Sequence, residues 1–313
     1  MPVPASLRER LRLPVIAAPM FIVSGPELVI AQCKAGVAGT MPSLNVRDAA
    51  GLEPVLVRIR ESLGEEDAPF GVNLIAHASN PRLAHDLDVC VRQRVPLIVT
   101  SLGPSAEIVA RVHGYGGIVF HDVVNARHAR KAAAAGVDGI VAVAAGAGGH
   151  AGTANPFALC REIRSFWQGP LALAGAITTG GDIAAAICMG ADLAYMGTRF
   201  IATQEAGAAP AYKDMLVASA IEDVIYTAYF SGVRGNYLKA SIIAAGLDPA
   251  MVGDAGQRPL AVTADGVKKA WKDIWSAGHG VGGISDIPDV AALVDRLEAE
   301  FRQSRAALTR EVA

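Results

Sequence analysis

The stretch Gly139-Ile-Val-Ala-Val-Ala-Ala-Gly-Ala-Gly-Gly-His150-Ala-Gly-Thr153 decides how this 313-residue chain is interpreted. It predicts a short apolar strand over 139–145 that runs into a glycine-rich loop with one ionisable side chain, His150. Glycine permits positive φ values and the close approach of a flat ligand to the backbone. An imidazole has an unperturbed pKa suited to proton transfer near neutral pH. We therefore expect a strand end that offers bare backbone to a cofactor and a base to a substrate.

The same order, a short apolar strand followed by a helix, recurs along the chain. Runs typical of strands occur at 14–20, 37–41, 70–75, 96–101, 117–121, 139–145, 170–175 and 193–197, and a stretch with helical spacing follows each. Eight such units favour an α/β fold of the TIM (β/α)8 barrel type over an open doubly wound sheet. No GxGxxG pattern follows the first strand, which argues against a Rossmann dinucleotide site.

The alternation stops near residue 221, which suggests a division of the chain. We expect residues 1–220 to form the barrel and residues 221–313 to form a capping segment and C-terminal helices packed on it. Helical spacing returns near 267–275 and 290–307. Leu293, Leu297 and Phe301 share one face of the last stretch, which predicts packing against the barrel or contacts in a homodimer.

Composition excludes several classes of protein. The formal net charge of -2 and the lack of a concentrated basic face argue against a nucleic-acid partner. Four cysteines form no CxxC pair, so we expect buried thiols and neither a disulfide framework nor a metal site. No apolar run approaches the roughly 18–20 residues of a membrane span, and the N-terminus has no apolar signal core. We therefore expect a cytoplasmic protein without membrane contact.

The loops after the strands of such a barrel meet at one face, where the chemistry of these proteins is found. That face would gather residues 19–20, Asn73, 100–101, 121–122, His150, 175–176 and 197–198. Small residues after the seventh and eighth strands could bind a phosphate through backbone N–H groups, without a lysine. Ordinary tight turns between strand and helix are the alternative interpretation.

Five short segments resemble the nitronate monooxygenases, formerly called 2-nitropropane dioxygenases. The segments are Phe70-Gly-Val-Asn73, Gly148-Gly-His-Ala-Gly152, Ala174-Gly-Ala176, Met196-Gly-Thr-Arg-Phe200 and Trp275-Ser-Ala-Gly278. The resemblance covers nearly the whole chain and implies a TIM barrel, non-covalent FMN at the strand ends and a histidine base beside the flavin. The same segments are similar to those of FMN-dependent enoyl-acyl-carrier-protein reductases and NADH:quinone reductases.

The resemblance also implies roles for individual residues. His150 matches the catalytic histidine, and Ser276 would approach the substrate side of the flavin or, alternatively, cap a helix end. The positions that match flavin-binding residues are Pro19, Met20, Asn73, Gly148, Gly149, Gly175, Ala176, Met196, Gly197 and Thr198.

Two positions depart from the family pattern. Val143 stands where the family often has a Gln or Asp that contacts the flavin, and Asp122 stands where some relatives have a lysine. We expect these changes to alter the flavin potential and the charge preference for substrate. Among the other histidines, His121 is a candidate for the site, while His128 is expected on a polar helix surface together with His77, His85 and His113.

Three functions follow from the resemblance. The first is FMN-dependent oxidation of nitroalkanes or alkyl nitronates with O2, in which His150 removes the α-proton of the neutral nitroalkane. The alternative is an FMN-dependent reductase that takes hydride from NAD(P)H and reduces a quinone or an enoyl thioester. The third is a flavin-binding barrel without turnover.

Overall fold

The computed structural model describes residues 3–253 and 274–308, and its centre is a ring of eight parallel strands. The strands are β1 (Val15–Ala17), β2 (Thr40–Pro42), β3 (Gly71–Ile75), β4 (Leu97–Ser101), β5 (Ile118–Val123), β6 (Gly139–Val143), β8 (Leu171–Ala174) and β9 (Leu193–Met196), in the order β1-β9-β8-β6-β5-β4-β3-β2. Ala17 N donates to Ala38 O (2.8 Å) and Ala38 N to Val15 O (3.2 Å), which joins β1 to the segment before β2. The predicted TIM barrel is confirmed.

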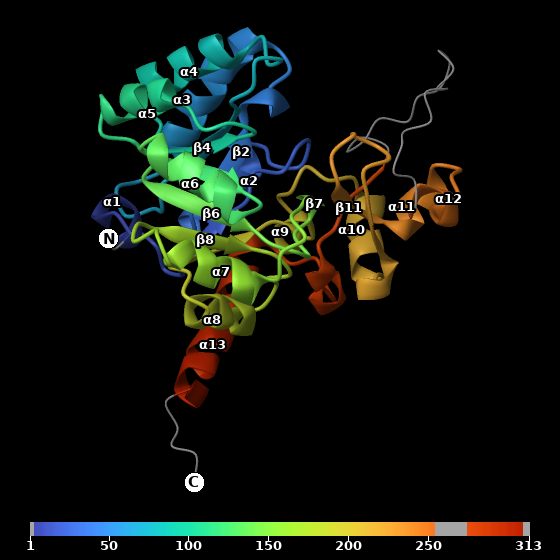
Figure 1. Cartoon of the computed structure of the whole chain (residues 1–313). Coiled ribbons are helices and arrows are strands. Elements are labelled where there is room, and N and C mark those ends of the chain that lie inside the picture. The colour runs from blue at the N-terminus through green and yellow to red at the C-terminus, as the bar shows by residue number, and fades with distance from the viewer. Residues whose placement is uncertain (1–2, 254–273, 309–313) are drawn as a thin grey trace.

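Seven helices alternate with these strands and cover the outside of the ring (Figure 1). They are α2 (Pro26–Lys34), α3 (Leu52–Ser62), α4 (Leu83–Arg92), α5 (Ala106–His113), α6 (Ala126–Ala134), α7 (Pro156–Arg164) and α8 (Gly180–Cys188). Side chains at the N-caps set where several of them begin: Ser105, Asn125 and Asn155 each accept a hydrogen bond from a backbone N–H of the first turn. Thr179 and Asp182 form a reciprocal capping box on α8.

The C-terminal helix α13 (Val290–Leu308) fills the remaining place on the ring. The helix directly after β9, α9 (Thr198–Ile201), has only four residues, and α13 packs against α8 and α2 instead (Figure 1). Leu293 and Leu297 are 1% exposed, so the apolar face predicted for this helix packs within the chain. Gly180 N donates to Glu300 Oε2 at 2.7 Å across the same contact.

The chain makes a long excursion between the last strand and this last helix. It contains α10 (Pro210–Val217), β10 (Val224–Thr227), β11 (Gly235–Leu238), α11 (Lys239–Ala244) and α12 (Pro249–Gly253), which lie together on one side of the barrel (Figure 1). β11 pairs antiparallel with β10 and with β7 (Gly149–His150), a small sheet that the sequence did not predict. We expected a helix near 267–275. Residues 267–273 lie outside the described residues, and Ile274 and Trp275 are not helical.

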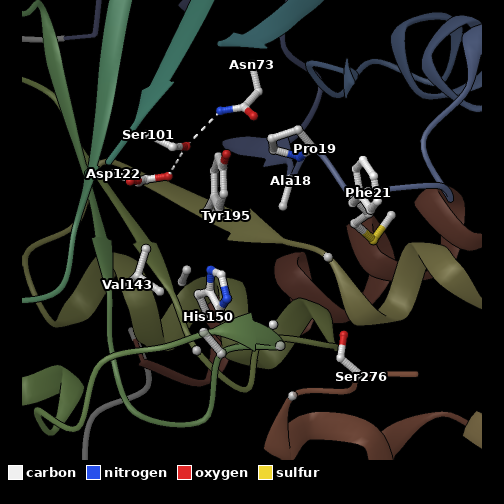
Figure 2. A pocket seen from close by; sticks show the side chains of 18 of the residues that line it. Ala18, Pro19, Phe21, Asn73, Ser101, Asp122, Val143, His150, Tyr195 and Ser276 are labelled. Carbon is white, nitrogen blue, oxygen red and sulfur yellow. Dashed lines mark hydrogen bonds between the residues drawn. The ribbon is translucent and has the colours of Figure 1, made fainter. Parts of the chain in front are cut away.

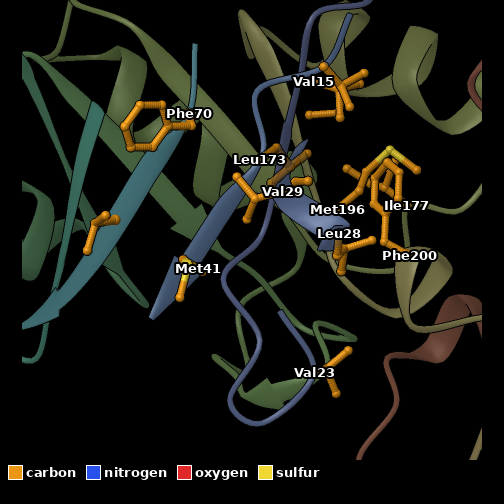
Figure 3. Packing of buried hydrophobic residues seen from close by; sticks show 14 of the residues in the cluster. Val15, Val23, Leu28, Val29, Met41, Phe70, Leu173, Ile177, Met196 and Phe200 are labelled. Atoms are coloured by element: carbon orange, nitrogen blue, oxygen red, sulfur yellow. The ribbon is translucent and has the colours of Figure 1, made fainter. Parts of the chain in front are cut away.

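Two apolar layers hold the fold together. Ile16, Val99, Phe120, Val141 and Leu193 belong to a cluster inside the ring. A larger cluster lies between the strands and the helices, where Leu28, Ile177, Met196 and Phe200 gather near one another (Figure 3). Strands buried on both sides are typical of parallel sheets, and they explain why the strand segments are continuously apolar in the sequence.

Three of the four cysteines agree with the expectation of buried thiols. Burial raises the pKa of Cys33 to about 12 and of Cys160 to about 11, and it raises the pKa of Cys90 further. Cys188 is exposed at the end of α8, contrary to that expectation. In the described ranges no helix is long and apolar enough to span a bilayer, and His, Cys, Asp and Glu form no group of three that could bind a metal ion.

The contact between α8 and α13 gives a test of this architecture. A Cβ on Gly180 would lie 2.2 Å from Leu297 O and 2.3 Å from Phe301 N, both backbone atoms, so Gly180→Ala must push the two helices apart. We expect a loss of about 1–3 kcal/mol in the free energy of unfolding, measured by urea denaturation. Gly181→Ala is the matched control, because its Cβ would meet only Ser304 Oγ at 3.4 Å and Thr179 Oγ1 at 3.5 Å. Equal stability of both variants would contradict this packing.

Candidate active site

A large pocket opens at the carboxyl ends of the barrel strands, with a volume of about 860 Å³ (Figure 2). This volume lies in the upper part of the range of small-molecule sites, about 300–1,000 Å³. Every residue predicted for the site lines it except Met196: the lining includes Pro19, Met20, Asn73, Gly148, Gly149, His150, Gly175, Ala176, Gly197, Thr198 and Ser276. The barrel thus brings together residues that are up to 257 positions apart in the sequence (276 − 19).

The loop that carries His150 is tied to the excursion by backbone pairing. β7 pairs with β11, with His150 opposite Gly235 and Gly149 opposite Asn236. The buried Asn236 donates from Nδ2 to Ala147 O at 2.7 Å, on the same loop. A Cβ on Gly235 would lie 2.7 Å from Gly149 O, so only glycine allows the two backbones to approach this closely. His150 is therefore placed from two sides, by β6 and by β11.

Hydrogen bonds to the His150 ring select one tautomer. His150 Nε2 lies 2.9 Å from Ser231 Oγ. The Ser231 hydroxyl donates its one hydrogen to Val233 O at 3.0 Å and also accepts from Tyr237 Oη at 3.3 Å. With the Ser231 hydrogen directed to Val233 O, Nε2 carries the ring hydrogen and Nδ1 is the basic atom of the neutral ring. Desolvation within the pocket lowers the pKa of His150 from its ordinary value, which favours the neutral ring.

The loops after β8 and β9 form a cradle of backbone N–H groups. Gly175 has φ +138°, and a Cβ there would lie 2.8 Å from Ala145 O. Thr198 Oγ1 accepts from Gly278 N at 2.9 Å, while the N–H groups of Thr198 and Arg199 stand in the first turn of α9, where a helix supplies no acceptor. The buried Arg199 side chain points elsewhere and pairs with Asp286 at 2.7 Å. The cradle fits a phosphate held by backbone donors.

Met196 and Ser276 lie differently from one another. Met196 is fully buried in the layer between strands and helices, and its carbonyl accepts from Ala18 N at 2.8 Å, so its side chain is not part of the pocket wall. Ser276 lies on the pocket wall in a segment outside the helices, and its carbonyl accepts from Tyr212 Oη at 2.6 Å. The alternative of a helix cap for Ser276 is therefore wrong.

A chain of hydrogen bonds crosses the polar wall opposite His150 (Figure 2). Asn73 Nδ2 donates to Val99 O (3.1 Å) and to Ser101 Oγ (2.8 Å), and Ser101 Oγ donates to Asp122 Oδ2 (2.5 Å). Both amide hydrogens of Asn73 are used, so this side chain offers its oxygen to the pocket. Burial raises the pKa of Asp122 to about 6, against a smaller lowering by Ser101. Asp122 and Val143, the two departures from the family pattern, both line the pocket.

Histidines and a lysine near β5 complete the lining. Thr100 Oγ1 lies 2.8 Å from Nδ1 of the buried His121, and burial with a contribution from His128 lowers the pKa of His121 to about 4. His128 was expected on a polar surface but lines the pocket with Lys131, whereas His77, His85 and His113 are exposed as expected. Sequence reasoning missed Lys131 and Tyr195. His128 and Lys131 lie in the first turns of the helix that follows β5. Such a helix begins at the pocket face of the barrel, so this position could have indicated that both residues line the pocket.

The carboxyl group of Asp122 gives a pH-dependent test of this wall. Its folded pKa of about 6 exceeds the usual 3.8, so the folded chain keeps a proton that the unfolded chain has released. Stability should therefore fall as pH rises through this interval, by at most about 1.4 kcal/mol per pH unit. We expect Asp122→Asn to remove this component of the urea-denaturation profile, and the exposed Asp214→Asn to leave it in place. Identical profiles for wild type and Asp122→Asn would contradict the assignment.

A family model and several known proteins are similar to this chain. The nitronate monooxygenase family model matches residues 7–300. A nitronate monooxygenase of Paraburkholderia phytofirmans is 29% identical over 93% of both chains. An octahydro-1H-indene-carboxyl-CoA dehydrogenase of Rhodococcus jostii is 29% identical over 74% of this chain, which spans 64% of that dehydrogenase. The crystal structure of a nitroalkane oxidase from Streptomyces ansochromogenes has a TM-score of 0.79 and 25% identity, and covers 97% of this chain and 100% of that one. The chain therefore belongs to the nitronate monooxygenase family of oxidoreductases.

Proposed function

We propose that the protein oxidises nitroalkanes or alkyl nitronates with O2, using FMN as its cofactor and His150 as its base. One observation carries the proposal. The Nε2 atom of His150 is hydrogen-bonded to Ser231, which leaves Nδ1 as the basic atom, and this ring lies in the same pocket as the phosphate cradle. The family relationship and the names of two relatives, a nitronate monooxygenase and a nitroalkane oxidase, support the choice of substrate.

The residues of the pocket suit FMN. The phosphate would bind at the loops after β8 and β9, where the N–H groups of Thr198 and Arg199 have no helical acceptor, and the ring system would lie against Pro19 and Met20. Asn73 would accept a hydrogen bond from the ring through its oxygen. Val143 is apolar and would only pack against the cofactor. When bound, FMN supplies the electron-accepting chemistry that links the substrate to O2.

His150 would act on the neutral nitroalkane. The α-carbon of a nitroalkane is acidic, and Nδ1 of His150 would take its proton, which leaves the nitronate anion and an imidazolium. A positioned base of this kind typically contributes about 10²–10⁴-fold to the rate. Ser231 would hold the ring in place through Nε2 in both protonation states, because Nε2 carries hydrogen in each. Ser276, across the pocket mouth, would help to orient the substrate.

Replacement of His150 should affect the activities on a nitroalkane and on a nitronate differently. We expect His150→Asn to lower kcat/KM for a neutral nitroalkane by about 10²-fold or more, because the proton acceptor is lost. Activity on the pre-formed nitronate should change far less, since that substrate has already lost the proton. Turnover of nitroethane and ethyl nitronate in an oxygen electrode would measure the difference, with the exposed His77→Asn as a control. Equal retention of both activities would exclude His150 as the base.

A second function has support from particular observations. The relative from Rhodococcus jostii acts on a CoA ester, and the pocket here extends from the phosphate cradle as far as Lys131 on α6. The protein would then be an FMN-dependent reductase that takes hydride from NAD(P)H and reduces an enoyl thioester or a quinone. Asp122 and Val143 are the positions at which this pocket departs from the pattern of nitronate enzymes, and both lie in the lining.

Anaerobic mixing distinguishes the two functions. If the protein is an oxidase, the visible absorbance of its flavin should persist for minutes after addition of NADH or NADPH and should bleach rapidly after addition of ethyl nitronate. If it is a reductase, the flavin should bleach rapidly after addition of NADH or NADPH and should persist after addition of ethyl nitronate. Stopped-flow absorbance without O2 measures both rates on one preparation. Rapid bleaching by a reduced nicotinamide, with none by the nitronate, would overturn the proposed oxidase.

A further inference from the structure

The hydroxyl group of Tyr195 differs from other tyrosine hydroxyls of the chain. Tyr195 lines the pocket from β9, is 9% exposed, and belongs to the apolar cluster inside the ring of strands. The hydroxyls of Tyr115, Tyr212 and Tyr226 donate to backbone carbonyls at 2.8, 2.6 and 2.8 Å. Within residues 3–253 and 274–308, the Tyr195 hydroxyl forms no hydrogen bond. A buried hydroxyl without a partner costs about 1–3 kcal/mol, so we expect its acceptor to be a ligand.

Tyr195 remains a hydrogen-bond donor in the pocket. Burial and, to a smaller extent, the charge of Asp122 raise the pKa of Tyr195 well above its usual range. The phenol therefore keeps its one hydrogen at neutral pH. Asp122 is not the acceptor, because its carboxylate accepts from Ser101 Oγ and forms no hydrogen bond with Tyr195 in the described part of the chain. The hydrogen of Tyr195 is thus available to a molecule in the pocket.

Tyr195 and Asn73 present a donor and an acceptor to the same part of the pocket. Figure 2 shows the hydroxyl end of Tyr195 directed toward the side where Asn73 and Ser101 lie. Both amide hydrogens of Asn73 are bonded to the protein, so this buried side chain offers its oxygen. A donor and an acceptor together match the edge of a flat heterocycle that carries a C=O next to an N–H. The ring system of FMN has such an edge.

The strands of this wall supply no cation. β3, β4, β5 and β9 contain no lysine or arginine, and Asp122 stands where some relatives have a lysine. Lys131, which also lines the pocket, belongs to helix α6. The oxygens of a flavin ring become more negative when the ring gains electrons. Hydrogen bonds to a charged acceptor are roughly twice as strong as those between neutral groups, so a neutral donor such as Tyr195 stabilises the reduced ring more than the oxidised ring.

We propose that Tyr195 donates a hydrogen bond to the polar edge of the flavin ring and thereby raises the reduction potential of the bound cofactor. As a neutral donor, Tyr195 supplies part of the stabilisation that a cation would give to the reduced ring. The inference rests on the proposed function for the identity of the cofactor, and it applies equally to an oxidase and to a reductase. It does not depend on the substrate or on the role of His150, so it is measured without turnover.

Anaerobic potentiometric titration of the FMN-loaded protein, with a reference dye, tests the inference. Tyr195→Phe removes the hydroxyl and keeps the aromatic ring in its cluster. We expect the affinity for reduced FMN to fall about tenfold more than the affinity for oxidised FMN, because the lost hydrogen bond is stronger to the reduced ring. This difference corresponds to a two-electron midpoint potential about 30 mV below that of the wild type. Tyr115→Phe is the matched control, since it loses a hydroxyl that donates to Val95 O outside the pocket lining.

A vibrational spectrum of bound FMN separates a direct hydrogen bond from a change in packing. Loss of the bond should shift a ring C=O stretching band to higher frequency in Tyr195→Phe, and the band should stay in place in Tyr115→Phe. An unchanged midpoint potential or an unchanged C=O band in FMN-loaded Tyr195→Phe would overturn the inference and leave the proposed function in place. A wild-type protein that binds no FMN would defeat both.

Discussion

The pairing of β7 with β11 is the contact on which the site depends. A two-residue strand at the end of the glycine-rich loop is held by backbone hydrogen bonds to a strand about 85 residues later, and the buried Asn236 holds the same loop through Ala147 O. Ser231, which fixes the tautomer of His150, lies in the turn between β10 and β11. The position of His150 therefore depends on β6 of the barrel and on β11, and its hydrogen-bond partner Ser231 comes from the segment after β9.

The excursion is in turn fixed by the return of the chain to the barrel. α13 occupies the place of an eighth outer helix, so the described residues that directly follow β9 and directly precede α13 lie against the barrel. Trp275 stacks on Tyr212 with ring centroids 4.9 Å apart, and Gly278 N donates to Thr198 Oγ1. These contacts bring the segment around Ser276 over the loops of β9. The loops of the barrel therefore form one wall of the pocket, and the segment after β9 forms the other.

The sequence predicted the barrel because each strand and helix has a local signature. Eight apolar runs and the helical spacing between them need no knowledge of distant contacts. The match to a family motif predicted wrongly that Met196 lines the pocket. Side chains alternate along β9, so Tyr195 faces the pocket while Met196 faces the helices. The period-2 rule would have separated them.

The rest of the site could not be predicted from local patterns. β7 has two residues and no periodicity, and its partner β11 lies in a region without a repeating pattern. The chain Asn73–Ser101–Asp122 joins three neighbouring strands, so it exists only once their register is known. His128 belongs to α6, whose sequence is typical of a polar surface helix. His128 lines the pocket because α6 directly follows β5.

We infer that a base on the β7 loop removes a substrate proton beside a bound flavin. Anaerobic stopped-flow reduction with nitroethane and with its α-deuterated form tests this most directly. We expect the flavin to bleach with both substrates and the deuterated substrate to react several-fold more slowly. A flavin that remains oxidised with nitroethane, or one that is reduced at the same rate by both forms, would contradict it.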